Sequence, residues 1–152
     1  MEPRFSMFDN EIGAKFAKRF ANASLVIAQS PLPKSVQQLT ALRASQINGC
    51  GWCVDMHTKD AAADGETAVR LNLVAAWREA SVFTEPERAA LALTEDVTLM
   101  ARDHVPASAY EAAAEQLTQG EIAALLSLII TINAWNAIGV TTRAWTPGSY
   151  QP

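Results

Sequence analysis

The chain has few of the groups that build metal sites, disulfide frameworks or nucleic-acid surfaces. Its 152 residues include two cysteines and two histidines, and charged residues make up only 18% of them. The net charge is −4, and the basic residues are scattered rather than gathered in a run. A mildly acidic chain has no general attraction to phosphate backbones or anionic lipids. We therefore expect neither nucleic acid nor a membrane surface as a partner.

Long apolar segments are also missing. The most hydrophobic stretch, residues 122–132, is well short of the ~20 apolar residues that a membrane helix needs. The N-terminal residues lack the apolar region typical of a secretory signal, so we expect a cytoplasmic protein. In a reducing compartment, two cysteines spaced C-x-x-C indicate redox chemistry or metal binding rather than a structural disulfide.

The patterns that are present indicate helices. No strand-like alternation of useful length occurs, and helical periodicity recurs between short turn signals. We predict an all-α helical bundle forming one domain over residues 1–152. The last helix is apolar on nearly every side in its first half and should be central or lie at a subunit interface. The predicted helices cover residues 10–28, 35–47, 50–65, 69–80, 84–101, a short segment after Pro106, and 121–145.

Two capping boxes strengthen these boundaries. Ser35 with Gln38, and Thr84 with Glu87, have the spacing at which an N-cap hydroxyl and a third-position side chain satisfy each other's backbone groups. In the helix opened by Thr84, periodicity puts residues Leu93, Val97, Met100 and Ala101 on the inner face.

The chemistry is concentrated in the segment GCGWCVDMH, residues 49–57. Cys50 and Cys53 are spaced to form a disulfide across one turn at the start of a helix, where the helix dipole favours a thiolate. His57 lies one turn beyond Cys53, so all three side chains project from one face. Its imidazole can accept a thiol proton or stabilise the thiolate.

Gln38 is the fourth candidate site residue. If the chain reverses at Asn48-Gly49 and the flanking helices run antiparallel, Gln38 comes within about a helical turn of the level of His57. It would then orient the imidazole. The alternative is that Gln38 only closes the capping box with Ser35.

Two other interpretations of the cysteine pair stay open at this point. The thiols could pack as small buried hydrophobes. They could also bind zinc with His57, and with His104 as a fourth ligand, although structural zinc usually has four ligands and no second C-x-x-C exists. The shared face with His57 at a helix start favours redox chemistry over both.

The stretch LRASQINGCGWCVDMHTKDA, residues 42–61, resembles the core of the AhpD-like alkylhydroperoxidases of the carboxymuconolactone decarboxylase superfamily. The similarity continues in the segments at 65–67, 75–79, 83–95 and 132–136. It implies an all-helical fold, a homo-oligomer (dimer, trimer or hexamer), and peroxide reduction with no metal or organic cofactor. It also implies a dithiol reductant, such as a lipoyl-bearing or thioredoxin-like protein.

By this resemblance Cys53 is the peroxidatic nucleophile, Cys50 resolves its sulfenic acid, and His57 belongs to the proton relay. One departure is that family members usually carry a glutamate where this chain has Gln38. An amide cannot relay a proton or strengthen imidazole basicity by its charge. The alternative function is therefore a non-catalytic redox sensor or oligomeric binding protein of the same fold.

Overall fold

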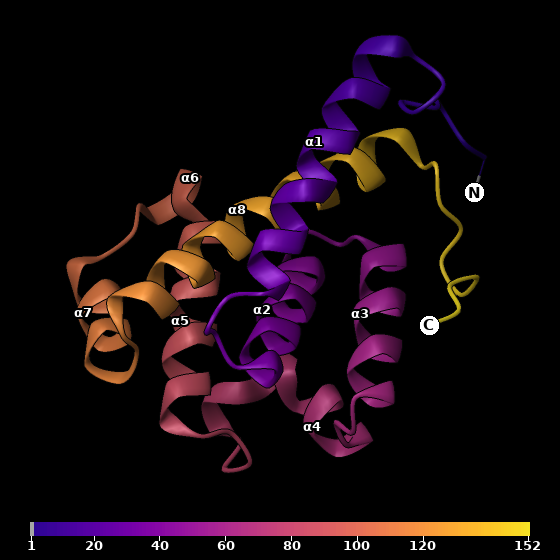
Figure 1. Cartoon of the computed structure of the whole chain (residues 1–152). Helices are drawn as coiled ribbons and strands as arrows, with labels where there is room; N and C mark the ends of the chain where they lie inside the picture. Colours follow the sequence, from indigo (N-terminus) through magenta and orange to yellow (C-terminus); the bar gives the residue numbers. More distant parts are fainter. Residues whose placement is uncertain (1) are drawn as a thin grey trace.

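The structure is a computed structural model that describes residues 2–152. These residues form helices joined by short loops, with no strand among them, so the all-α prediction is confirmed (Figure 1). The elements are α1 (Glu11–Ala28), α2 (Lys34–Ile47), α3 (Gly51–Ala63), α4 (Ala68–Leu73), the 3-10 helix η1 (Val74–Glu79), α5 (Glu85–Thr98), α6 (Met100–Asp103), α7 (Ala107–Gln116) and α8 (Gln119–Thr142).

Helix α2 is the centre of the bundle and packs against α3, α5 and α8. Apolar side chains fill the space on both sides of it, which gives two main core clusters. One cluster joins α2 to α5, α7 and α8, and the other joins α2 to α3, α4, η1 and α5. The largest fully buried apolar residues in them are Leu39, Leu42, Val74, Leu91, Leu93, Leu125 and Ile129.

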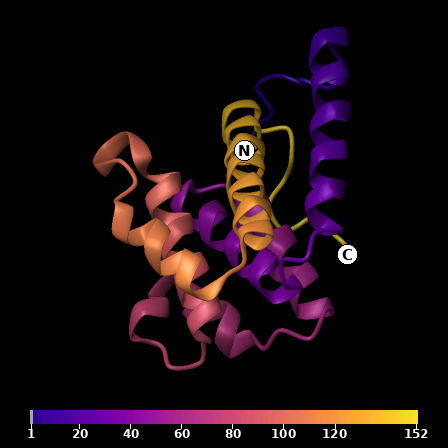
Figure 2. The same cartoon turned by 60° about the vertical axis from the view of Figure 1, so that its left-hand side comes forward.

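Helix α8 is the long apolar helix that the sequence predicts to be central. The expectation that its apolar stretch is too short for a membrane helix is wrong by length and composition, because the whole helix of 24 residues is apolar enough to cross a membrane. In the fold it packs against α1, α2, α3, α5 and α7 (Figure 1), and 39% of its most apolar window is buried. Helix α1 lies against α8 on the outside of the bundle (Figure 2). Trp135 of α8 contacts the ring of Phe20 in α1, with the ring centroids 5.4 Å apart.

Local signals explain several helix ends. The predicted capping box of Thr84 and Glu87 opens α5, and a second box, Thr118 with Glu121, opens α8. The predicted end of α3 at Gly65 is confirmed, because Gly65 has a φ of 100°, which favours glycine after a helix.

Three details of the prediction are wrong, and in the first two of them tertiary contacts replace local ones. No side chain caps α2, which starts after Pro33, so Ser35 and Gln38 form no capping box. The helix predicted over 69–80 is a short α4 followed by η1, with non-helical φ and ψ at Ala76. The Arg88 guanidinium binds the backbone carbonyls around Trp77 instead.

The third error concerns the end of α5. The chain leaves the helix at Leu99, so Met100 is 59% exposed rather than on the inner face. The apolar periodicity of the sequence continues past Leu99, so it does not show where α5 ends.

Candidate redox site

The cysteine pair lies where α2 turns into α3. Gly49 adopts a φ of 67° in the turn, which suits glycine because it has no Cβ. The chain then enters α3 with Cys50 at the N-cap position, and the Cys50 N–H donates to the Ser45 carbonyl at 3.0 Å. Cys53 follows in the first turn. The predicted placement of both sulfurs at a helix start is therefore what the structure has.

Cys50 and Cys53 form a disulfide, and their Cα atoms are 5.3 Å apart. Both side chains are buried, with only 3% and 2% of their surface exposed. They are not two separate thiols packed as hydrophobes. The pair can therefore store or release two electrons by breaking and reforming one bond.

A cavity of about 360 Å³ opens beside Cys53. It lies between α1, α2, α3 and α8, and its wall is almost entirely apolar. His57 borders the same cavity as Cys53, which brings the imidazole and this sulfur to one space. The other apolar lining residues are Ala41, Trp52, Met56, Leu128, Ile132, Trp135 and Trp145.

A second cavity, of about 370 Å³, borders Cys50. Its wall includes the turn before α3, the last turn of α8, and the C-terminal tail, which we define as residues 143–152. Trp52 and Trp145 line both cavities and stack on each other with centroids 4.8 Å apart. Each sulfur therefore has its own cavity, and the tryptophan pair lies between the two.

His57 carries an unsatisfied nitrogen. Its Nε2 is buried and has no hydrogen-bond partner within residues 2–152. Burial lowers the pKa of His57 from its ordinary 6.5 to about 4, against an opposing effect of the Asp60 carboxylate. The ring is therefore neutral at pH 7 when the disulfide is formed. A neutral imidazole with a vacant nitrogen can accept a proton from a nearby thiol.

Gln38 reaches the same region as His57 but does not hold the ring. Both residues line a third cavity, of about 530 Å³, between α1, α2, α3 and α8. The Gln38 amide donates to Asp64 at the end of α3, so the predicted hydrogen bond that orients the imidazole is not formed. The antiparallel hairpin brings Gln38 to the predicted level, but Asp64, which sequence spacing does not reveal, takes the amide.

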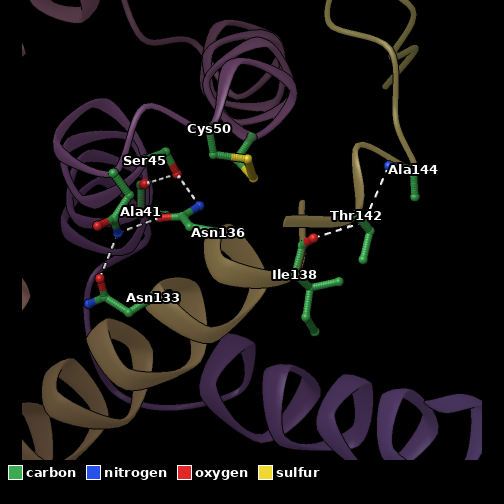
Figure 3. The surroundings of a disulfide bond; sticks show 10 residues. Ala41, Ser45, Cys50, Asn133, Asn136, Ile138, Thr142 and Ala144 are labelled. Carbon is green, nitrogen blue, oxygen red and sulfur yellow. Dashed lines mark hydrogen bonds between the residues drawn. A yellow bond between two sulfur atoms is a disulfide. The ribbon is translucent and has the colours of Figure 1, made fainter. Parts of the chain in front are cut away.

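A buried polar cluster that the sequence analysis missed holds the α2–α3 turn against α8 (Figure 3). The Asn48 amide donates to Asn133 at 2.6 Å and to Asn136 at 3.0 Å, and the Asn136 amide donates to Ser45 Oγ at 3.1 Å. Because Cys50 is tied to the Ser45 carbonyl, this cluster fixes the start of α3. The sequence signal for this cluster is the pair Asn133 and Asn136, which are polar residues in an otherwise apolar last helix.

The C-terminal tail is the other component that the sequence did not indicate. Its backbone N–H groups at Gly148 and Tyr150 donate to Asp55 Oδ2, and Lys59 Nζ donates to the Tyr150 carbonyl at 2.9 Å. The Tyr150 ring meets Trp52 edge to face at 5.7 Å. The tail therefore runs along α3, as Figure 1 shows, and covers the outer face of the site.

His104 lies far from this region in the fold, as the exposed C-cap residue of α6. Within residues 2–152, no three His, Cys, Asp or Glu side chains cluster in a way that could hold a metal ion. In residues 2–152 the two cysteines are joined to each other instead of being grouped with a third such ligand.

The fold is a helical bundle with a C-x-x-C disulfide at the start of α3 and a histidine one turn further along that helix. Residues 14–96 match the carboxymuconolactone decarboxylase family. The chain belongs to this family, and its fold is AhpD-like.

Two similar proteins span nearly the whole chain. The uncharacterised protein YdfG of Bacillus subtilis (strain 168) is 34% identical over 140 residues, which are 92% of this chain and 94% of YdfG. The crystal structure of ATU0492 from Agrobacterium tumefaciens, a protein of unknown function described as a candidate antioxidant defence protein AhpD, is 35% identical with a TM-score of 0.89. That match covers 96% of this chain and 99% of ATU0492.

A more distant structure supports the fold alone. It is an uncharacterised peroxidase-related protein from Silicibacter sp. TM1040, with 17% identity and a TM-score of 0.76. The match covers 87% of this chain and 70% of that one.

Proposed function

We propose that the protein is a thiol-dependent peroxidase that reduces hydrogen peroxide or organic hydroperoxides through Cys53, Cys50 and His57. The observation that carries this proposal is the disulfide at the start of α3, with the vacant Nε2 of His57 bordering the same cavity as Cys53. Membership of the carboxymuconolactone decarboxylase family supports it, as does the similarity to ATU0492.

The reaction starts from the reduced dithiol. His57 takes the Cys53 thiol proton, and the thiolate attacks the outer oxygen of the peroxide. The O–O bond breaks, Cys53 becomes a sulfenic acid, and the leaving alkoxide or hydroxide takes a proton to give an alcohol or water. The Cys50 thiol then attacks the Cys53 sulfur, which forms the disulfide and releases water.

A dithiol restores the enzyme by exchange. One of its thiolates attacks the disulfide, and its second thiol releases the mixed disulfide, so the reductant leaves oxidised and both cysteines leave reduced. A lipoyl-bearing or thioredoxin-like protein has the chemistry of such a donor. The cytoplasm supplies the reducing conditions that this cycle needs.

The apolar wall beside Cys53 supports organic peroxides as substrates. Trp52, Met56, Leu128, Ile132 and Trp135 offer a carbon-rich surface, while the sulfur and the imidazole are the reactive groups at its edge. Burying an alkyl chain of the peroxide there would contribute roughly 0.8 kcal/mol for each CH₂ group.

Stopped-flow kinetics tests the proposal. The reduced protein is mixed with hydrogen peroxide or with an alkyl hydroperoxide, and disulfide formation is followed together with the count of free thiols. We expect loss of two thiols per peroxide consumed. Cys53→Ser should abolish the reaction, whereas Cys50→Ser should still react once and stop at the sulfenic acid. Equal rates for Cys53→Ser and the parent would contradict the assignment.

A redox sensor without turnover is the second candidate function. The observation that favours it is the Gln38 amide, which is neutral and tied to Asp64. If the missing carboxylate limits catalysis, Gln38→Glu should raise the peroxidase rate substantially. A rate that stays within about twofold of the parent would remove the support for a sensor, because less than ~0.5 kcal/mol of barrier would depend on this position.

We also propose that the chain forms a homo-oligomer of two, three or six copies. Helix α1 exposes apolar side chains to solvent, notably Ile12 at 81%, Val26 at 71% and Leu25 at 60%. Ile130 of α8 is 61% exposed as well. Light scattering coupled to size-exclusion chromatography measures the number of copies, and a monomer at micromolar concentration would contradict the proposal.

A further inference from the structure

Asp60 is placed to act on His57. It lies three residues further along α3, and side chains at this spacing are neighbours on a helix surface. Both residues line the cavity between α1, α2, α3 and α8 that Gln38 also lines. Asp60 forms no ion pair within residues 2–152, so its charge is not neutralised by a lysine or arginine there.

The C-terminal tail fixes this carboxylate in place. The Tyr150 hydroxyl donates to Asp60 Oδ1 at 2.8 Å. Tyr150 is itself held by Asp55 through its N–H, by Lys59 through its carbonyl, and by Trp52 through its ring. A segment distant in sequence is therefore anchored at four points of α3, and one of them is the carboxylate that faces the histidine cavity.

The other polar groups around this cavity are already satisfied or neutral. Asp64 is paired with Lys34 at 2.6 Å and also accepts the Gln38 amide. No charged side chain of α1 or α8 borders the cavity. This leaves Asp60 as the carboxylate that can act on the imidazole, and the Asp60 charge does raise the pKa of His57 against the effect of burial.

We infer that Asp60 is a positioning residue for His57. Asp60 holds the imidazolium that forms when Cys53 loses its proton, and Tyr150 holds Asp60. This inference rests on the proposed role of His57 in peroxide reduction. The proton passes from the Cys53 sulfur to His57 Nε2, and the Asp60 anion stabilises the resulting cation without becoming protonated itself. The negative charge of a glutamate at the position of Gln38 is then not needed in this chain, because Asp60 supplies it.

The pH dependence of alkylation tests the inference without any peroxide. In a Cys50→Ser background, Cys53 is the sole thiol, and its rate of reaction with iodoacetamide follows the thiolate fraction. We expect Asp60→Asn to move the midpoint up by about one pH unit, which is a roughly tenfold loss of rate below the midpoint. Asp60→Glu should keep the midpoint near that of the parent.

Two controls separate charge from structure. Asp103→Asn makes the same charge change on α6, at a residue that neither lines the cavity nor holds the tail, so it should not raise the midpoint. In a His57→Gln background, Asp60→Asn should also leave the midpoint where it is, because Asp60 acts through the imidazole. Circular dichroism checks that each variant is folded, and Asp60→Ser replaces Asp60→Asn if that variant is not.

An unchanged midpoint in folded Asp60→Asn, or an equal rise without His57, would overturn the inference. Because alkylation needs no peroxide, a failure of the peroxidase proposal leaves this measurement valid. Conversely, an active peroxidase with an unchanged midpoint would refute only the role of Asp60.

Discussion

Cys53 and Cys50 belong to one disulfide, yet the cavities beside them are built differently. The Cys53 cavity is lined by α1, α2, α3 and α8, with an apolar wall and the buried nitrogen of His57. The Cys50 cavity is lined by the turn at Gly49 and the end of α8, together with the tail residues Arg143, Trp145, Thr146 and Pro147. Apart from Trp145, which lines both cavities, packed helices form the wall beside Cys53, and largely loops form the wall beside Cys50.

This difference indicates a division of labour. A cavity made by packed helices keeps its shape and excludes water, which suits the deprotonation and attack proposed for Cys53. A cavity bounded by a surface segment can open with little loss of core packing, because loops and termini unfold locally at low cost. That suits the exchange with a reductant at Cys50. The following predictions test how far the two sides differ.

Removal of the imidazole should have the largest effect. His57→Gln should slow the reaction of the reduced protein with an alkyl hydroperoxide by about a thousandfold, because the base for Cys53 is lost. Arg143→Gln changes the other cavity, and we expect less than about a threefold change, since it lies on the Cys50 side of the tryptophan pair. Stopped-flow rates measure both. Equal losses would contradict a division between the cavities.

A lower pH should decrease the free energy of unfolding of the oxidised protein, because His57 beside Cys53 is buried as a neutral ring. The pKa of His57 falls from 6.5 in the unfolded chain to about 4 in the fold. Between these values the unfolded chain binds a proton that the native state does not, so the free energy of unfolding decreases as the pH is lowered. The full loss is up to about 3 kcal/mol, and it is complete below pH 4.

Urea denaturation at a series of pH values between 7 and 4 measures this loss. His57→Gln does not titrate in that range and serves as the control. Its unfolding free energy should depend less on pH than that of the parent, by the amount given above. If the two pH profiles coincide, His57 is not buried as a neutral ring.

The Cys53 side could be predicted from sequence, whereas the Cys50 side could not. Spacing within one helix put Cys50, Cys53 and His57 together, and Asn48-Gly49 indicated the turn that brings α2 alongside them. These are short-range rules of helix geometry. The tail reaches Asp55 and Asp60 from about 90 residues away in the chain, and no periodicity encodes such a contact.

The role of Gln38 shows the same limit at shorter range. Antiparallel packing correctly brought it to the level of His57, since both line one cavity. The choice of hydrogen-bond partner depended on Asp64, which follows the last turn of α3 and is itself paired with Lys34. Backbone topology follows from patterns along the chain, but the pairing of exposed polar side chains depends on the final packing.

Gly139 tests how closely α8 must approach the Cys50 sulfur. A Cβ at this position would lie 3.1 Å from Cys50 Sγ and 3.1 Å from the Trp145 ring. We expect Gly139→Ala to lower the free energy of unfolding by about 1 kcal/mol, because overpacking outweighs the gain in helix propensity. Chemical denaturation of the oxidised protein measures it.

Gly120 offers a matched control on the same helix. A Cβ there would meet only Pro31, at 3.8 Å, which is an ordinary contact. Gly120→Ala should therefore leave stability unchanged or raise it by up to about 1 kcal/mol. If Gly139→Ala stabilises the protein as much as Gly120→Ala does, α8 has room beside Cys50 and the narrow approach is not required.

The tail should produce the smallest effect. Asp55→Asn weakens the hydrogen bonds from Gly148 and Tyr150, so the tail should open more often and the disulfide should be reduced by dithiothreitol about threefold faster. Asp103→Asn, an exposed carboxylate on α6, makes the same charge change away from the tail and should leave the rate unchanged. Peroxide attack on Cys53 should change less than reduction does, because Asp55 borders neither the Cys53 cavity nor the cavity shared by His57 and Asp60, and Tyr150 still donates to Asp60 whenever the tail is closed. A faster reaction with peroxide, rather than with the reductant, would mean that the tail covers the Cys53 side and that the two cavities have been assigned the wrong way round.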